Sequence, residues 1–245
     1  MKGVPMPITI EYHDVIGSTS DRAKELAASG VGNICVVANE QTAGRGRMGR
    51  SFFSPPGTGL YMSLVLPPDD PAMLTVAAAV FVSETLEEMI GEPVGIKWVN
   101  DILLRDRKIC GILAEGRFGE DGRMRDLIVG IGINLRKTAF PPDLRRIAGD
   151  VETLTGKRPD RRRLLEKLVG RFEGWDGDAG TVIGPYRSRS VVIGKNVTVT
   201  RGSEIFEATA LSVSDSGGLW VDCGGERRLL KSGEVSVRIG QEQNG

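Results

Sequence analysis

The chain has 245 residues, of which 40% are hydrophobic and 26% are charged, as expected of a folded globular protein. Its 32 basic residues balance 32 acidic ones, which excludes a general electrostatic field for nucleic acid or for an anionic membrane. The sequence has no signal-peptide core and no apolar run of about 20 residues, and its three cysteines are widely spaced. We therefore expect reduced thiols and a cytoplasmic protein.

The larger, N-terminal part of the chain mixes helix and strand signals. Residues 18–20 offer capping hydroxyls for a helix that Gly30 ends. Apolar positions at helical spacing predict a long helix over Ala72–Ile90, and Pro159 begins a second amphipathic helix over Asp160–Trp175. Strands are expected at residues 8–12, 33–39, 59–66, 94–98, 101–104, 109–118 and 125–134. Helices and strands do not alternate as regular βαβ units, so the order predicts the α+β class with a mixed sheet.

The composition changes after about residue 185. Five short strands follow at close spacing, separated by turn residues, and this pattern is typical of a small β-barrel. Residues 175–186 (WDGDAGTVIGPY) are interpreted as the linker. The predicted organisation is a catalytic domain over residues 1–180 and a C-terminal barrel over residues 187–240. The five strands are expected in the segments GKNVTVTRG, EIFEATALSVSD, GGLWVDCG, GERRLLK and GEVSVRI.

The segment QTAGRGRMGRSFFSPPGTGLY, residues 41–61, contains two overlapping anion-binding patterns. Gly44, Gly46 and Gly49 fit the dinucleotide fingerprint G-x-G-x-x-G, and residues 44–51 fit a P-loop with arginine in place of lysine. Both motifs require a helix directly after the glycines, and the proline pair at 55–56 forbids one there. The remaining interpretation is a loop that closes over an anion, using backbone N–H groups and arginines.

Three further motifs follow this loop in order: KWVND at 97–101, KICGILAEG at 108–116 and GIGINL at 130–135. Together with GRGRMGR at 44–50, they resemble the motifs of biotin protein ligases, over a span from about Ser18 to the final barrel. The resemblance implies a mixed-sheet catalytic domain of the biotin/lipoate ligase type, followed by a small SH3-like barrel. It also implies an activity: biotin and ATP give biotinyl-5′-adenylate, which a lysine of a biotin carboxyl carrier domain then attacks.

The resemblance also assigns roles to individual residues. Lys97 is expected to bridge the biotin carboxylate and the α-phosphate, while Arg45 and Arg47 neutralise further charge. Ser20 stands where the family has Asn, and Val99 where it usually has Pro. Asn134, with Arg45 and Lys97, is assigned to ATP. The residues expected to contact biotin or its adenylate are Ser18, Thr19, Ser20, Gln41, Gly44, Arg45, Gly46, Arg47, Lys97, Gly111, Gly130 and Gly132.

The expected co-substrate is ATP with Mg²⁺, held mostly through phosphates and water, so no protein metal ligand is assigned. Asp101 is either a metal or second-layer partner or a structural carboxylate. The ligase region begins near the N-terminus, which leaves no room for a winged helix, so we expect no DNA binding and no membrane association. A homodimer built on the central sheet is expected from the resemblance.

Two other functions fit parts of the sequence. A lipoate or octanoate ligase or transferase shares the catalytic fold but would have a different arginine-glycine region. An RNA-binding module would explain the basic loop and the barrel, but the chain has zero net charge and no aromatic stacking platform. Biotin-dependent ATP–pyrophosphate exchange, set against heparin binding, distinguishes the enzyme from the RNA-binding module.

Overall fold

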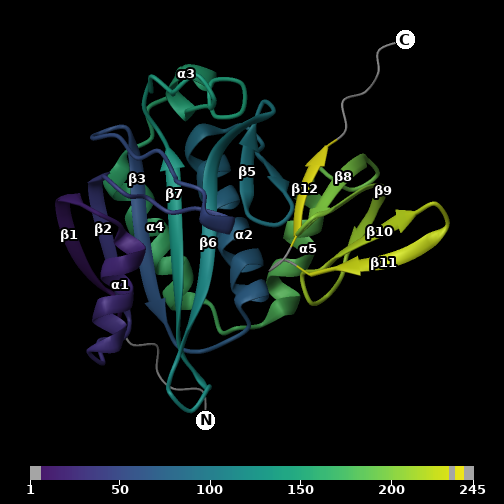
Figure 1. Cartoon of the computed structure of the whole chain (residues 1–245). Coiled ribbons are helices and arrows are strands. Elements are labelled where there is room, and N and C mark those ends of the chain that lie inside the picture. The colour runs from purple at the N-terminus through teal and green to yellow at the C-terminus, as the bar shows by residue number, and fades with distance from the viewer. Residues whose placement is uncertain (1–6, 232–234, 240–245) are drawn as a thin grey trace.

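The computed structural model describes residues 7–231 and 235–239. A seven-stranded sheet forms its larger part, with helices on both faces, and a five-stranded sheet lies beside it (Figure 1). The strand order of the large sheet is β1-β2-β3-β7-β6-β5-β4. Its strands are β1 (Thr9–Ile16), β2 (Ile34–Gln41), β3 (Gly59–Leu66), β4 (Gly95–Lys97), β5 (Asp101–Leu104), β6 (Arg107–Phe118) and β7 (Met124–Asn134).

The predicted mixed sheet is confirmed, with one detail that the sequence did not indicate. Strands β1 and β2 run parallel, joined by helix α1 (Thr19–Ala28), so the chain begins with a single βαβ unit. All the other neighbouring strands of this sheet are antiparallel. Strand β1 also runs past the expected segment 8–12 to Ile16.

The two faces of the large sheet are covered unequally. Alternate residues of a strand point to opposite faces, and Val36, Val65 and Ile128 pack under α1 on one face. Their neighbours Val37, Leu64 and Val129 belong to the larger core on the other face, which includes helix α2 (Pro71–Ile90). Helices α4 (Arg161–Gly174) and α5 (Ala179–Arg189) contribute to the same core. The remaining helix, α3 (Val151–Thr155), is short. Helix α1 thus covers only part of this face of the sheet, and the rest of the face is open for a site.

Helix α5 corrects the interpretation of residues 175–186 as a linker. Asp178 caps it by accepting a hydrogen bond from the Gly180 N–H, and Val182, Ile183 and Tyr186 are buried. The glycines and Pro185 suggested a turn-rich segment, but burial of these three side chains stabilises the helix despite its poor local propensity. The long helix over 72–90 and the second helix over 160–175 are confirmed as α2 and α4.

The five C-terminal strands fall in the five predicted segments and form one antiparallel sheet. Their order is β11-β10-β9-β8-β12, and Val197, Ala210 and Val221 are among the side chains buried in it. Over the described residues, no helix is both long and apolar enough to span a membrane. The strands are β8 (Asn196–Arg201), β9 (Glu204–Val213), β10 (Leu219–Cys223), β11 (Glu226–Leu230) and β12 (Val235–Ile239).

Candidate active site

A cavity of about 720 Å³ lies on the face of the large sheet that carries α1. This volume is within the range typical of small-molecule sites. Eleven of the residues assigned from the sequence line it: Thr19, Ser20, Gln41, Arg45, Gly46, Arg47, Lys97, Gly111, Gly130, Gly132 and Asn134.

Buried hydroxyl groups form one end of the cavity, where α1 begins. Ser63 Oγ lies 2.8 Å from Thr19 Oγ1 and 3.0 Å from Ser20 Oγ. The Gln41 side chain accepts hydrogen bonds from the N–H and the hydroxyl of Thr19, each at 2.9 Å, and donates to Ser54 Oγ. These bonds fix several donors and acceptors in a buried place, which suits recognition of a polar but uncharged group.

Strand β7 forms the floor of the cavity and gives it a direction. Gly130, Gly132 and Asn134 are alternate residues of the strand and therefore face the cavity together. The strand is about 13 Å long from residue 130 to residue 134, which sets the length of the floor. A Cβ atom on Gly130 would lie 2.8 Å from Ser20 Oγ, and one on Gly132 would lie 2.4 Å from the Phe52 ring. Glycine is therefore needed at both positions to keep the floor flat. The hydroxyl end lies at Gly130, and Asn134 marks the far end, where its amide donates to the Gly149 carbonyl at 3.0 Å.

The glycine-arginine loop lies across the middle of the cavity. After Arg45 the chain makes a 3₁₀ turn over Arg47–Gly49 and returns to pair with itself through an Arg45–Ser51 bridge. Met48 and Gly49 have φ angles of 57° and 72°, a left-handed conformation that closes this turn. No long helix follows the glycines, which confirms the rejection of both nucleotide motifs.

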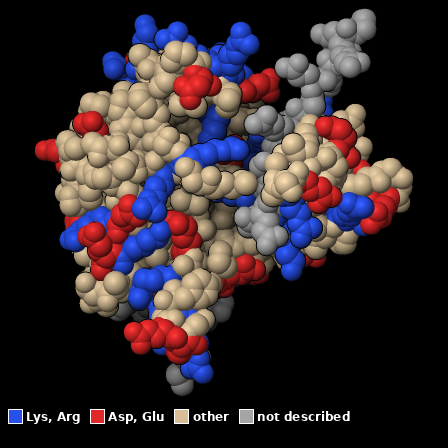
Figure 2. Space-filling model, viewed as in Figure 1, with Lys and Arg blue, Asp and Glu red and all other residues tan. Residues whose placement is uncertain are grey.

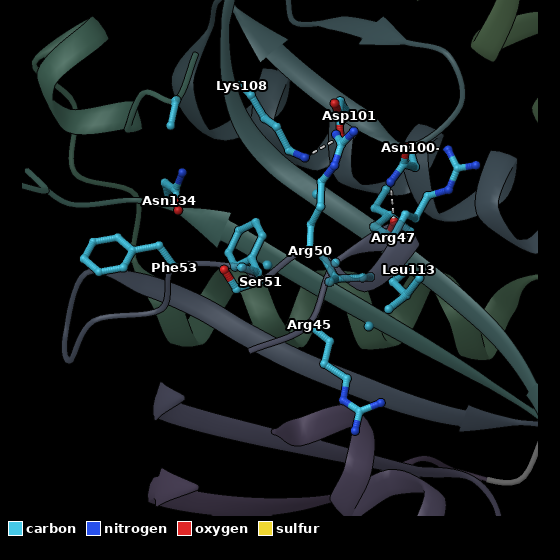
Figure 3. A pocket seen from close by; sticks show the side chains of 18 of the residues that line it. Arg45, Arg47, Arg50, Ser51, Phe53, Asn100, Asp101, Lys108, Leu113 and Asn134 are labelled. Carbon is cyan, nitrogen blue, oxygen red and sulfur yellow. Dashed lines mark hydrogen bonds and ion pairs between the residues drawn. The ribbon is translucent and has the colours of Figure 1, made fainter. Parts of the chain in front are cut away.

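The arginines of this loop reach in different directions (Figure 3). Arg45 points toward α1, where its guanidinium lies 3.0 Å from the carboxylate of Asp21. Arg47 donates to Asn100 Oδ1 at 3.3 Å, and burial lowers the pKa of its guanidinium while nearby Asp101 opposes that shift. Arg50 also lines the cavity. Basic side chains gather at the centre of this face, where the surface is hollowed (Figure 2).

A second lysine, Lys108, lies in the cavity wall together with Lys97. Lys108 Nζ is 2.5 Å from Asp101 Oδ1 and would be 3.2 Å from a Cβ atom on Gly111. Gly111 pairs with Gly132 across β6 and β7, so this ammonium lies over the middle of the floor. Lys97 of the KWVND motif was assigned from the sequence, whereas Lys108, the first residue of KICGILAEG, was not. A signal for Lys108 was present, because it begins the same motif that contains the assigned Gly111.

Aromatic residues form the far end of the cavity, and none of them was assigned from the sequence. The rings of Phe53 and Phe140 are 6.4 Å apart between centroids, and both line the cavity with Ile147, which is 58% exposed. Phe140 and Ile147 belong to residues 138–148, a segment without periodic signal that only the tertiary structure brings here.

Two assigned residues do not line the cavity. Ser18 is buried as the N-cap of α1 and accepts a hydrogen bond from the Asp21 N–H at 3.3 Å. Gly44 lies where a Cβ atom would come 2.5 Å from the Phe52 carbonyl oxygen, so it allows a close backbone approach. Their expected contacts with ligand stay predictions.

The carboxylates along the wall are Asp101 and Asp143. Within residues 7–231 and 235–239, no cluster of three or more His, Cys, Asp or Glu side chains could hold a metal ion. One or two carboxylates fit Mg²⁺ that is bound chiefly through substrate phosphates and water.

A polar uncharged end, a cationic middle and an aromatic far end suit an enzyme that binds an extended ligand with a polar uncharged end and an anionic middle. The Biotin/lipoate A/B protein ligase family matches residues 12–134, and the Biotin protein ligase C terminal domain matches residues 192–238. The chain belongs to the biotin/lipoate protein ligase family.

Individual relatives agree with this membership. The bifunctional ligase/repressor BirA of Bacillus subtilis is 36% identical over 238 residues, covering 92% of this chain and 73% of that protein. The biotin–[acetyl-CoA-carboxylase] ligase of Mycobacterium tuberculosis is 30% identical, covering 91% of this chain and 87% of its own. The biotin protein ligase of Aquifex aeolicus in complex with biotin and ATP has a TM-score of 0.82 at 30% identity, covering 95% of this chain and 99% of that one.

Proposed function

We propose that the protein is an ATP-dependent biotin protein ligase, which forms biotinyl-5′-adenylate and transfers biotin to a lysine of a carrier domain. The observation that carries this proposal is the order of chemistry along β7: hydroxyls at Gly130, cations at Gly132 and aromatic rings beyond Asn134. The ureido ring of biotin would occupy the hydroxyl end. Its carboxylate would then reach the lysines and arginines, and the adenine would enter the aromatic end.

The first step joins two anions, and the cations make their approach possible. A carboxylate oxygen attacks the α-phosphorus, the bond to the β-phosphate oxygen breaks, and pyrophosphate leaves. Charge builds on the phosphoryl oxygens in the transition state, where preorganised cations stabilise it most. Mg²⁺, when bound with ATP, neutralises phosphate charge, and Asp101 or Asp143 would hold it.

The second step consumes the mixed anhydride. The ε-amine of the carrier lysine attacks the biotinyl carbonyl, the bond to the AMP oxygen breaks, and a proton leaves the new amide nitrogen. Closure of residues 44–50 over the adenylate would exclude water, which would otherwise hydrolyse the anhydride. We propose that the carrier belongs to a biotin-dependent carboxylase, since the M. tuberculosis relative bears the name of the acetyl-CoA carboxylase ligase. We further propose a cytoplasmic homodimer in which each chain has a catalytic domain followed by a second, C-terminal domain. Since α5 packs in the core of the large sheet, the boundary between the two domains lies after this helix.

The role of bridging cation has two candidates, Lys97 and Lys108. Lys97 is the residue assigned from the KWVND motif, and Lys108 has its ammonium over the middle of the floor. We expect Lys97→Ala and Lys108→Ala each to slow adenylate formation by roughly 10²–10³, with the larger effect at Lys108, while biotin binding changes less. Lys137→Ala, at an exposed position outside the cavity, is the matched control. Normal pyrophosphate release in either variant would remove that lysine from the role.

The test of the function is ATP–pyrophosphate exchange without any carrier protein. Exchange that depends on biotin, and not on lipoate or octanoate, is the expected result. Exchange with lipoate alone would favour the alternative activity of the same fold. Heparin binding without any exchange would favour the RNA-binding module.

A further inference from the structure

The short turn between β4 and β5, residues 98–100, and Asp101 directly after it carry the anchors of two cavity cations. Asn100 Oδ1 accepts the hydrogen bond from Arg47, and Asp101, which follows directly, forms the ion pair with Lys108. The Asn100 amide donates to the Ile112 carbonyl at 2.7 Å, and the Ile112 N–H donates to the Asn100 carbonyl at 3.0 Å. The position of this turn therefore determines the positions of the Arg47 and Lys108 side chains in the cavity.

Two buried hydrogen bonds hold this turn from outside the large sheet. The Trp98 indole N–H donates to the Gly217 carbonyl at 2.9 Å, and Gly217 lies in the turn between β9 and β10 of the C-terminal sheet. The Tyr186 hydroxyl, from α5, donates to the Val99 carbonyl at 3.0 Å. Trp98 is 4% exposed, Val99 1% and Tyr186 0%, so water cannot replace either bond.

Tyr186 also belongs to the electrostatic surroundings of the site. Burial raises the pKa of its hydroxyl, and the nearby charge of Asp101 raises it further while Arg47 lowers it. The hydroxyl therefore stays protonated and keeps donating at any pH at which the enzyme works. Asp101 and Arg47 are therefore close enough to affect the pKa of the Tyr186 hydroxyl.

We infer that Tyr186 and Trp98 are positioning residues for adenylate formation, through which α5 and the C-terminal sheet hold Asn100 and Asp101 in place. Neither side chain supplies a reacting group in this inference, which rests on the proposed ligase activity. These two hydrogen bonds, from Trp98 and from Tyr186, are called the brace below. The hydroxyl end of the cavity is formed by other elements, α1, β2 and β3, and does not depend on the brace. The C-terminal sheet thus contributes to activation of the carboxylate without contacting it.

Tyr186→Phe tests the brace because it removes one oxygen atom and leaves the ring packed. We expect the kcat of biotin-dependent pyrophosphate exchange to fall about tenfold, the effect of losing one buried hydrogen bond of about 1.4 kcal/mol. Biotin affinity, measured by calorimetry without ATP, is expected to stay within about twofold. Tyr12→Phe, at a tyrosine that is 64% exposed on β1, is the matched control and is expected to change neither quantity.

Two further measurements separate a positioning role from a general loss of stability. Tyr186→Phe combined with Asn100→Ala should cost less than the sum of the single effects, whereas its combination with Gln41→Ala should be additive. Deuterium uptake at the Ile112 amide, which donates to Asn100, should become about tenfold faster in Tyr186→Phe and not in Tyr12→Phe.

Full exchange activity in Tyr186→Phe, a parallel loss of biotin binding, or additive effects with Asn100→Ala would overturn the inference. If the wild-type protein showed no biotin-dependent exchange, the proposed function would fail instead. Deuterium uptake at Ile112 would then decide alone whether Tyr186 braces the turn: unchanged uptake refutes it, and faster uptake upholds it.

Discussion

Arg47 is the residue whose replacement should most clearly separate formation of the adenylate from its retention. The Arg47→Gly variant loses the hydrogen bond to Asn100 Oδ1, which fastens the loop over residues 44–50 to the wall of the cavity. A hydrogen bond from a charged donor contributes about 1.5–3 kcal/mol. Since this one is long, at 3.3 Å, we take the lower limit, about 1.5 kcal/mol, which corresponds to roughly tenfold faster loss of the intermediate.

The assay follows where the lost intermediate goes. Each variant is incubated with biotin, ATP and an unrelated protein, and the biotin attached to that bystander is measured. Activation should persist in part, since both cavity lysines remain, so the released adenylate acylates exposed lysines. Arg105→Gly makes the same chemical change at an exposed arginine with a φ of 48°, and it is expected to label no more than wild type.

Bystander labelling at the wild-type level by Arg47→Gly, with activation intact, would refute the role of this loop as a lid. Loss of labelling together with loss of pyrophosphate exchange would instead place Arg47 in the activation step.

Three other predictions follow from particular contacts. Gly132→Ala should weaken biotin binding by roughly tenfold, because its Cβ atom would press on the Phe52 ring, which also packs edge-on against Tyr61. Gly170→Ala, in open space on α4, should leave binding unchanged, and calorimetry measures both. The Arg22 hydrogen bond, and then that of His13, lower the pKa of Glu11 from 4.5 to about 2, so its stabilising contribution is complete above pH 4.5 and is lost as the pH falls toward 2. Glu11→Gln should therefore reduce the free energy of unfolding by about 1 kcal/mol at pH 6 and by much less at pH 2.5, and an equal reduction at both would contradict this cause. Because the net charge is zero, we also expect no sequence-selective, salt-resistant shift of DNA in a gel assay.

The sequence alone determined the class of fold and most of the chemistry of the site. Apolar periodicity located α2 and α4, turn residues separated the five C-terminal strands, and Pro55 and Pro56 excluded a helix after the glycine-arginine loop. Eleven assigned residues line one cavity, since motifs of glycines and cations keep their spacing where a ligand dictates it. Each of these signals lies within a short stretch of residues, so it can be recognised without knowing the tertiary structure.

The tertiary structure decided what depends on contacts between distant segments. The local helix propensity of residues 179–189 is low, but burial of Tyr186 among residues of other elements outweighs it. The reason for this helix therefore lies in residues that are distant in the sequence. Phe140 reaches Phe53, and Trp98 reaches Gly217, across separations that carry no periodic pattern. The place of the Lys108 ammonium is of the same kind. Lys97 and Lys108 both belong to recognisable motifs, and only the pairing of Gly111 with Gly132 places the Lys108 ammonium over the cavity floor.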